Sequence, residues 1–158
     1  MNATIAQAAA RSPQALRAIL VGGLIGGVFD ITYASIMTIR AGATPDRMLR
    51  SIAAGLCGRD VISSGGWEYA VLGLALHFFI ALSAATTYYV ASRKLTFLVA
   101  YALVCGPAFG AIWWLFMNRV VLPLSALGVS PKFQWPGFLA IVFLIGMPIA
   151  LSVRHYSR

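Results

Sequence analysis

Apolar residues in this chain are gathered into four long stretches, which charged or turn-forming residues separate. Each stretch is mostly apolar over about 20 residues, enough for an α-helix rising about 1.5 Å per residue to cross a hydrocarbon core about 30 Å thick. The pattern predicts an all-α integral membrane protein that folds as one four-helix transmembrane domain over residues 1–158. The predicted spans are residues 17–40, 67–91, 96–122 and 135–153.

The first span is expected to be an uncleaved anchor. Ser12 and Pro13 predict its start, with Ser12 as the N-cap and Pro13 at the first helical position. The apolar run continues through Asp30 to Ile39, which is longer than the apolar region of a signal peptide. Cleavage of this segment is therefore not expected.

The connection between the first two spans carries a shorter helical pattern over residues 45–57. Pro45 and Asp46 are a helix-start signal, and apolar positions then recur at helical spacing: Met48, Leu49, Ile52, Ala53 and Leu56. A helix of about 13 residues is too short to span a bilayer, so it would be interfacial or re-entrant. We favour the interfacial placement because Arg47 and Arg50 would be costly at depth.

Small residues form close-packing faces on three of the predicted spans. In the first span, one helical face holds Gly23, Gly26, Gly27, Asp30 and Ala34. Gly73 begins a similar stripe in the second span, and Gly106 and Gly110 form a GxxxG pair in the third. Because small residues let helix backbones approach closely, these glycines are predicted packing positions.

Aromatic and basic residues near the span ends are expected at the membrane–water interfaces. The predicted interface residues are Arg47, Arg50, Trp67, Tyr88, Arg119 and Trp135.

Within the spans, Pro107 after Gly106 predicts a kink, and Pro148 predicts a bend. Both predictions follow because proline cannot continue the helical hydrogen-bond pattern.

The net charge of +8 does not indicate a nucleic-acid partner in this context. The basic residues gather at helix ends, where they meet anionic headgroups, and form no basic face with interleaved aromatic residues. Four spans place both termini on one side of the membrane, and Lys and Arg then divide six to six between the two sides. We favour cytoplasmic termini because three of the six opposing charges lie in one long structured loop and a fourth, Arg40, directly precedes it.

Asp30 and His77 are the ionisable residues predicted near the middle of the spans, with Tyr33 and Asn118 as further members of a polar site. Three roles are open for the pair. The two residues would form a proton or ion relay, because histidine changes charge near physiological pH. Alternatively, His77 would bind a metal or haem iron, or the pair would be structural and fix the packing of two helices.

Motifs for catalysis are absent from the sequence. It contains no HExxH, GxSxG or P-loop motif and no pair of carboxylates at a usable spacing. Cys57 and Cys105 share no metal-ligand spacing. We therefore expect a protein that is not an enzyme and that holds no cofactor or metal, with a membrane lipid-modifying enzyme as a distant alternative.

A pattern in the second half of the chain carries a family resemblance. Its residues are Leu76-His77-Phe78-Phe79, Ala84-Ala85, Tyr88-Tyr89, Asn118 and Val121-Leu122-Pro123-Leu124. The chain resembles uncharacterised bacterial inner-membrane proteins of the YagU-like kind. The resemblance implies a multi-pass protein of a bacterial inner membrane and indicates no activity. Such relatives often carry another histidine early in the last span, where this chain has Phe138-Leu139-Ala140-Ile141, which weakens a two-histidine haem or metal site.

The sequence is best interpreted as an accessory or structural membrane subunit, or a self-associating protein, with a buried polar site at Asp30 and His77. The small-residue faces exceed what one bundle needs, so the expected partners are the lipid bilayer, further copies of the chain or other membrane subunits. The alternative is a small proton, ion or solute transporter that uses Asp30 and His77 as a relay.

Overall fold

Four helical segments of this protein are long and apolar enough to cross a membrane. The computed structural model describes the backbone of residues 2–157 and the side chains of residues 13–157, and this part of the chain is helical with no β-strand. The four segments are Pro13–Arg40, Trp67–Lys94, Ala102–Leu124 and Trp135–Tyr156. The predicted all-α class and the four membrane-length apolar helices are therefore confirmed.

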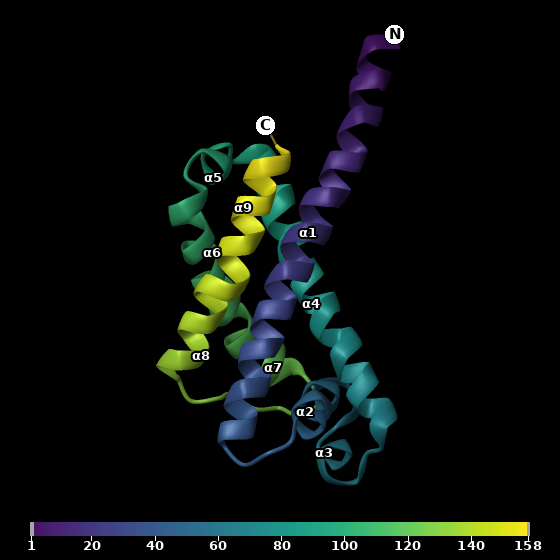
Figure 1. The fold of residues 1–158 in the computed structure, drawn as a ribbon, viewed down its shortest axis with the longest axis vertical. Helices are drawn as coiled ribbons and strands as arrows, with labels where there is room; N and C mark the ends of the chain where they lie inside the picture. The colour runs from purple at the N-terminus through teal and green to yellow at the C-terminus, as the bar shows by residue number, and fades with distance from the viewer. Residues whose placement is uncertain (1, 158) are drawn as a thin grey trace.

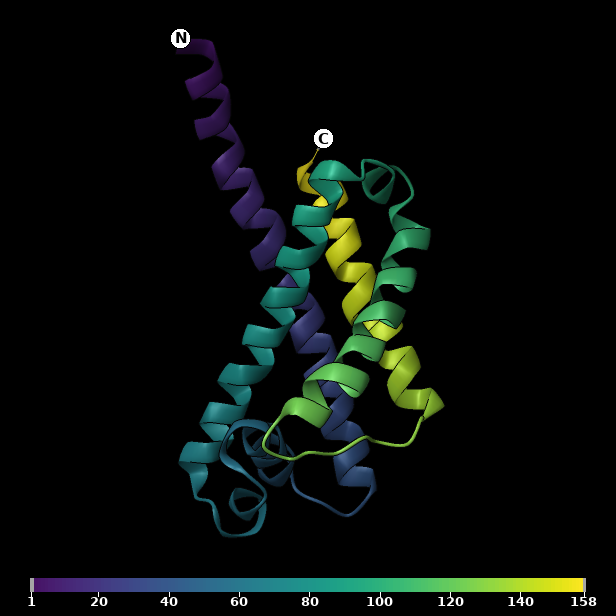
Figure 2. The ribbon, with the colours of Figure 1, turned by 180° about the vertical axis from the view of Figure 1, so that it is seen from behind.

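The four segments run alternately in opposite directions, so the two ends of the chain lie at the same end of the bundle (Figure 1). Seen from behind, α4 and α6 flank α9 (Figure 2). The elements in chain order are α1 (Asn2–Arg40), α2 (Pro45–Cys57), α3 (Asp60–Ser64), α4 (Trp67–Lys94), α5 (Phe97–Ala100), α6 (Ala102–Phe116), the π-helical η1 (Met117–Val121), α7 (Leu122–Leu124), α8 (Trp135–Ala140), the π-helical η2 (Ile141–Gly146) and α9 (Met147–Tyr156).

Helix α1 begins at Asn2, so the predicted start at Ser12 and Pro13 is wrong. Pro13 lies inside the helix. Its ring removes one backbone hydrogen bond, to the carbonyl of Ala9. Five alanines within residues 3–10 have the highest helix propensity of any residue type, which favours a helix on the N-terminal side of the proline.

The predicted third span, residues 96–122, is interrupted at Tyr101, whereas Pro107 lies within α6. Helix α6 is continuous through Gly106 and Pro107, and a break that the sequence did not predict separates α5 from α6. Pro107 is the sixth residue of α6, so it removes one hydrogen bond of the helix, to the carbonyl of Leu103.

Each π-helical segment lies directly before a proline. η1 ends two residues before Pro123, and η2 ends two residues before Pro148. A proline cannot donate to the carbonyl four residues earlier and its ring crowds that carbonyl, so the preceding turn widens. The bend predicted at Pro148 thus takes the form of a π-helical turn N-terminal to it.

The buried core lies in the half of the bundle nearer the chain termini. It is made of Ala18, Ala84, Ala85, Tyr88, Ala102, Ile145, Ile149, Ala150 and Val153. Tyr88 was predicted at the membrane interface, but its side chain is fully buried. Its hydroxyl donates a 2.9 Å hydrogen bond to the backbone carbonyl of Leu98. Tyr88 therefore packs inside the bundle and not on its surface, because α5 folds back over the end of α4 and supplies this acceptor.

Two glycines of α1 lie against the last helical segment. A Cβ added at Gly22 would lie 3.1 Å from the Cα of Ile149 in α9. A Cβ added at Gly26 would lie 3.2 Å from the carbonyl oxygen of Leu144 in η2. Close to Gly22, the Ser152 hydroxyl donates a buried 2.9 Å hydrogen bond to a backbone carbonyl of α1. The backbones of α1 and this segment are therefore in direct contact.

Two other glycines of α1 lie against α4. A Cβ added at Gly23 would lie 2.8 Å from the Cδ2 atom of Leu82, and one at Gly27 would lie 2.9 Å from the ring of Phe78. The glycines predicted to share one packing face of α1 thus divide between two neighbouring helices. α1 lies between α4 and α9 and contacts both along much of its length.

Helix α6 crosses η2 through glycines on both sides. A Cβ at Gly110 would lie 2.7 Å from the Cα of Val142, and one at Gly106 would lie 2.9 Å from the carbonyl oxygen of Gly146. A Cβ at Gly146 would overlap the carbonyl of Gly106. Gly106 and Gly110 were predicted packing positions, whereas Gly146, which completes this crossing, was not predicted.

Helices α2 and α3 cover the end of the bundle opposite the termini (Figure 1). Gly73 of α4 lies so close to the carbonyl of Leu49 in α2 that a Cβ there would overlap it. The C-terminal part of α2 is also bonded to the loop after α7, because the amide of Ala126 donates to the carbonyl of Gly55 at 2.9 Å. Leu56, predicted on the apolar stripe of α2, is instead 66% exposed.

We expect Gly146→Ala to lower the melting temperature in detergent, because the added methyl group must separate α6 from η2. Overpacking of this kind destabilises by about 1–3 kcal/mol. Gly137→Ala is the matched control, since Gly137 lies in helix α8 with open space around its Cα. Equal melting temperatures for the two variants would contradict this account of the crossing.

Candidate functional site

Asp30 and His77 lie at similar depth on two antiparallel helices. Asp30 precedes the last residue of α1, Arg40, by ten positions, and His77 follows the first residue of α4, Trp67, by ten positions. Both side chains are partly buried. The carbonyl that the His77 ring contacts belongs to Gly27, less than one helical turn before Asp30. The structure thus brings the two predicted mid-span residues close together.

His77 joins α4 to the backbone of α1. Its Nε2 atom lies 2.9 Å from the carbonyl oxygen of Gly27. A carbonyl only accepts hydrogen bonds, so Nε2 carries the proton and Nδ1 is the acceptor in the neutral ring. Gly27 has no side chain to shield its carbonyl, and it lies one turn before Asp30. The Nε2 proton of His77 is therefore bonded to the Gly27 carbonyl and is not available for a hydrogen bond to Asp30.

The Asp30 carboxylate makes no hydrogen bond or ion pair with any residue within the described part of the chain. The two oxygens of an ionised carboxylate accept hydrogen bonds and donate none. A charged side chain at mid-depth costs on the order of 2.5–3.5 kcal/mol on insertion scales. Asp30 is therefore an acceptor without a donor near the middle of a membrane-length apolar helix, where that state would be unfavourable in a bilayer.

The other two residues of the predicted polar site are not bonded to this pair. The amide of Asn118 donates a 2.9 Å hydrogen bond to the carbonyl of Trp114 in its own segment. This bond lies where α6 passes into η1, so it stabilises the backbone at the change of helix type. Tyr33 is partly buried and forms no side-chain hydrogen bond within residues 13–157.

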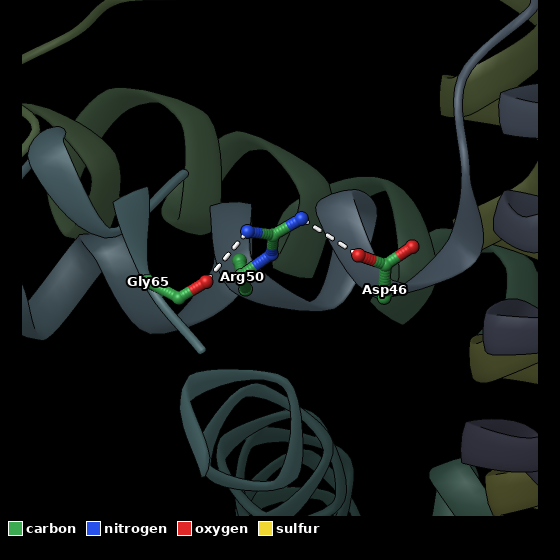
Figure 3. A network of polar contacts seen from close by, with 3 residues as sticks. All are labelled: Asp46, Arg50 and Gly65. Atoms are coloured by element: carbon green, nitrogen blue, oxygen red, sulfur yellow. Dashed lines mark hydrogen bonds and ion pairs between the residues drawn. The ribbon is translucent and has the colours of Figure 1, made fainter. Parts of the chain in front are cut away.

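A second polar cluster lies outside the spans, at Arg50 of α2. Arg50 donates to the carbonyl of Gly65 at 2.7 Å and to the Asp46 carboxylate at 2.6 Å (Figure 3). Its Nε atom is buried and has no hydrogen-bond partner in the described part of the chain. The guanidinium therefore ties α2 to the turn before α4, a contact that its prediction as an interface residue did not include. The i, i+4 spacing of Asp46 and Arg50 indicated the ion pair, but nothing local indicated the Gly65 carbonyl.

Hydrogen bonds lower the pKa of the Asp46 carboxyl below its ordinary value of 3.8, first from the Thr44 hydroxyl and then from Arg50. The remaining predicted interface residues are exposed at helix ends or in η1: Arg47, Trp67, Arg119 and Trp135. Among the described residues, no three His, Cys, Asp or Glu side chains are grouped so that they could hold a metal ion.

Comparisons of the chain with protein-family models, curated proteins and solved structures found no match. The resemblance to YagU-like inner-membrane proteins therefore stays a prediction. The site has to be interpreted from its own geometry.

We expect His77→Leu to lower the free energy of unfolding by about 0.6–2 kcal/mol, the range measured for hydrogen bonds between membrane helices. Thermal melting in mild detergent measures this loss. Thr86→Val is the matched control on the same helix, because the Thr86 hydroxyl donates only within α4, to Leu82. If both variants melt alike, the His77–Gly27 bond contributes nothing to the packing of α1 against α4.

We expect the ion pair at Asp46 to make the α2 end of the protein sensitive to acid. Because the pKa of Asp46 is lowered in the folded state, its contribution is fully present above about pH 3.8 and is lost as the pH falls through the lowered pKa. Melting temperatures of the wild type and Asp46→Asn, compared from pH 6 to pH 3, should converge at the acidic end. A gap that stays constant over this range would contradict the prediction.

Proposed function

We propose that this protein is a non-catalytic membrane subunit that contacts a partner through Asp30, either a second copy of the chain or another membrane protein. The observation that carries the proposal is the unpaired carboxylate of Asp30 at mid-depth. The side chains of His77 and Ser152 donate hydrogen bonds to backbone carbonyls of a neighbouring helix, α1. Asp30 needs a donor instead, and helix-interior N–H groups are already bonded.

The packing of the bundle limits the surfaces at which a partner would bind. The glycine faces that suggested surplus packing surface are occupied within one chain, by α4 and η2 against α1 and by η2 against α6. A partner is therefore expected to recognise the polar group at Asp30, with a basic or amide side chain on a partner helix as the donor. Such polar contacts between membrane helices contribute about 1–2 kcal/mol in model peptides.

A second candidate function rests on the same carboxylate. Asp30 would bind a proton or small cation and pass it on with the help of His77, whose Nδ1 atom is not needed for the bond to Gly27. In this proposal the Nδ1 atom of His77 takes up and releases the proton, while Nε2 keeps its bond to the Gly27 carbonyl of α1. The protein would then be a small proton or ion transporter.

We further propose a bacterial inner-membrane location with both termini in the cytoplasm. Two arginines on the side opposite the termini donate to backbone carbonyls: Arg50 to Gly65, and Arg59 to Leu127. These two arginines therefore stabilise the loop end of the protein through hydrogen bonds. Arg17, Arg93 and Lys94 on the terminal side are exposed, as the positive-inside rule expects of a cytoplasmic face, and four basic residues of the opposite side are exposed as well: Arg40, Arg47, Arg119 and Lys132.

Substitution of Asp30 by Asn and by Leu tests the two functions. Asparagine keeps an oxygen that accepts a hydrogen bond, so a partner contact should survive Asp30→Asn and be lost in Asp30→Leu. The measurement is the mass of the purified particle in mild detergent. A wild-type particle of one chain with no bound protein would contradict the subunit proposal.

Flux in liposomes separates the transporter from the subunit. A proton or cation site needs the ionisable group, so both Asp30→Asn and Asp30→Leu should abolish pH- or ion-dependent flux while the fold is retained. His77→Gln should also reduce flux, because a relay needs a titrating group at each position. Wild-type protein without flux, or unchanged flux in the Asp30 variants, excludes the transporter.

A further inference from the structure

An apolar groove runs along the contact between α1 and the last helical segment, two elements that lie side by side in Figure 1. Its volume is about 510 Å³, and its walls include Val21, Ile25 and Phe29 of α1 and Leu144, Pro148 and Leu151 of η2 and α9. These positions recur at helical spacing on each element, so the groove follows the helix axes from mid-depth toward the termini. Its size is that of a site for an extended hydrocarbon chain or a similar ligand.

A small polar recess lies at the terminal end of the bundle. It has a volume of about 130 Å³ and is lined by Gln14, Tyr89, Arg93, Tyr156 and Ser157. The guanidinium of Arg93 lies 5.8 Å from the centre of the Tyr89 ring, within reach of a cation–π interaction that orients it. The recess therefore offers one positive charge together with amide and hydroxyl groups able to donate hydrogen bonds.

The groove and the recess meet at Tyr156, which lines both. His155 also lines this end of the groove, with its ring edge-on to Tyr156 at 4.8 Å between centroids. The two cavities therefore place an apolar groove next to a basic, hydrogen-bonding recess. This arrangement matches a lipid in which an acyl chain adjoins a negatively charged phosphate.

We propose that this composite site holds one anionic phospholipid of the surrounding bilayer, with an acyl chain in the groove and the phosphate in the recess beside Arg93. Basic pockets between transmembrane helices bind anionic headgroups in this way. Burial of the acyl chain against the two helices adds the apolar contribution. Neither cavity is lined by Asp30 or His77, so the site is independent of the function proposed above.

The charge at the recess is tested with Arg93→Gln and the matched variant Lys94→Gln. Both changes remove one positive charge at the same end of α4, but Lys94 lines neither cavity. Delipidated protein is titrated with phosphatidylglycerol and with phosphatidylcholine, and bound lipid is counted by native mass spectrometry. We expect the wild type to prefer phosphatidylglycerol, and Arg93→Gln to reduce that preference about fivefold, the effect of one basic residue near a charged surface.

The groove is tested with Ile25→Trp and its neighbour Leu24→Trp. The two side chains are 43% and 44% exposed on α1, but only Ile25 lines the groove. The indole should fill the groove in Ile25→Trp and reduce binding of phosphatidylglycerol, while Leu24→Trp should bind as the wild type does. Melting temperatures show that each variant is folded.

Three results would overturn the proposal. A wild type that binds both lipids equally has no anionic site. Equal effects of Arg93→Gln and Lys94→Gln would assign any preference to the general surface charge of this end of the bundle. Equal effects of Ile25→Trp and Leu24→Trp would show that the acyl chain does not enter the groove.

Discussion

The close approach of α1 to two helices at once is the constraint on which the rest of the bundle depends. Between apolar helices in a hydrocarbon solvent there is little hydrophobic driving force, so packing and hydrogen bonds must hold them together. Four glycines in two adjacent pairs, at 22–23 and 26–27, let α1 meet α4 on one side and η2 and α9 on the other. The same approach exposes the carbonyl of Gly27 to His77. A larger residue at Gly27 would separate α1 from α4 and would also keep His77 from reaching the Gly27 carbonyl.

The sequence predicts features that depend on local pattern. Runs of about 20 apolar residues specify the four long helices, and the glycine spacing on α1 identifies positions of close packing. The sequence does not predict which helix each glycine contacts. Gly23 and Gly26 were predicted on one face, yet they meet different helices, because a stripe of small residues does not encode the crossing angle of two partners.

The candidate site was predictable only in part, for a similar reason. Mid-span position identified Asp30 and His77, but the acceptor of His77 is a backbone carbonyl, which every residue has and which no side-chain pattern marks. Arg50 shows the same limit at the loop end, where the carbonyl of Gly65 is its partner. Asn118 was grouped with the site because it is polar, whereas its amide supports the widened turn before Pro123.

An asymmetry between donors and acceptors explains why Asp30 differs from the other polar groups of the spans. A backbone carbonyl has two lone pairs and remains an acceptor after its helical bond is made, whereas each N–H has one proton and is fully used. Donors such as His77 and Tyr88 can therefore be satisfied almost anywhere that two helices touch. An ionised Asp30 cannot, and it must gain a proton, a cation or a donor side chain from elsewhere. The two proposed functions differ only in which of these it receives, so the identity of that donor defines the role of the protein.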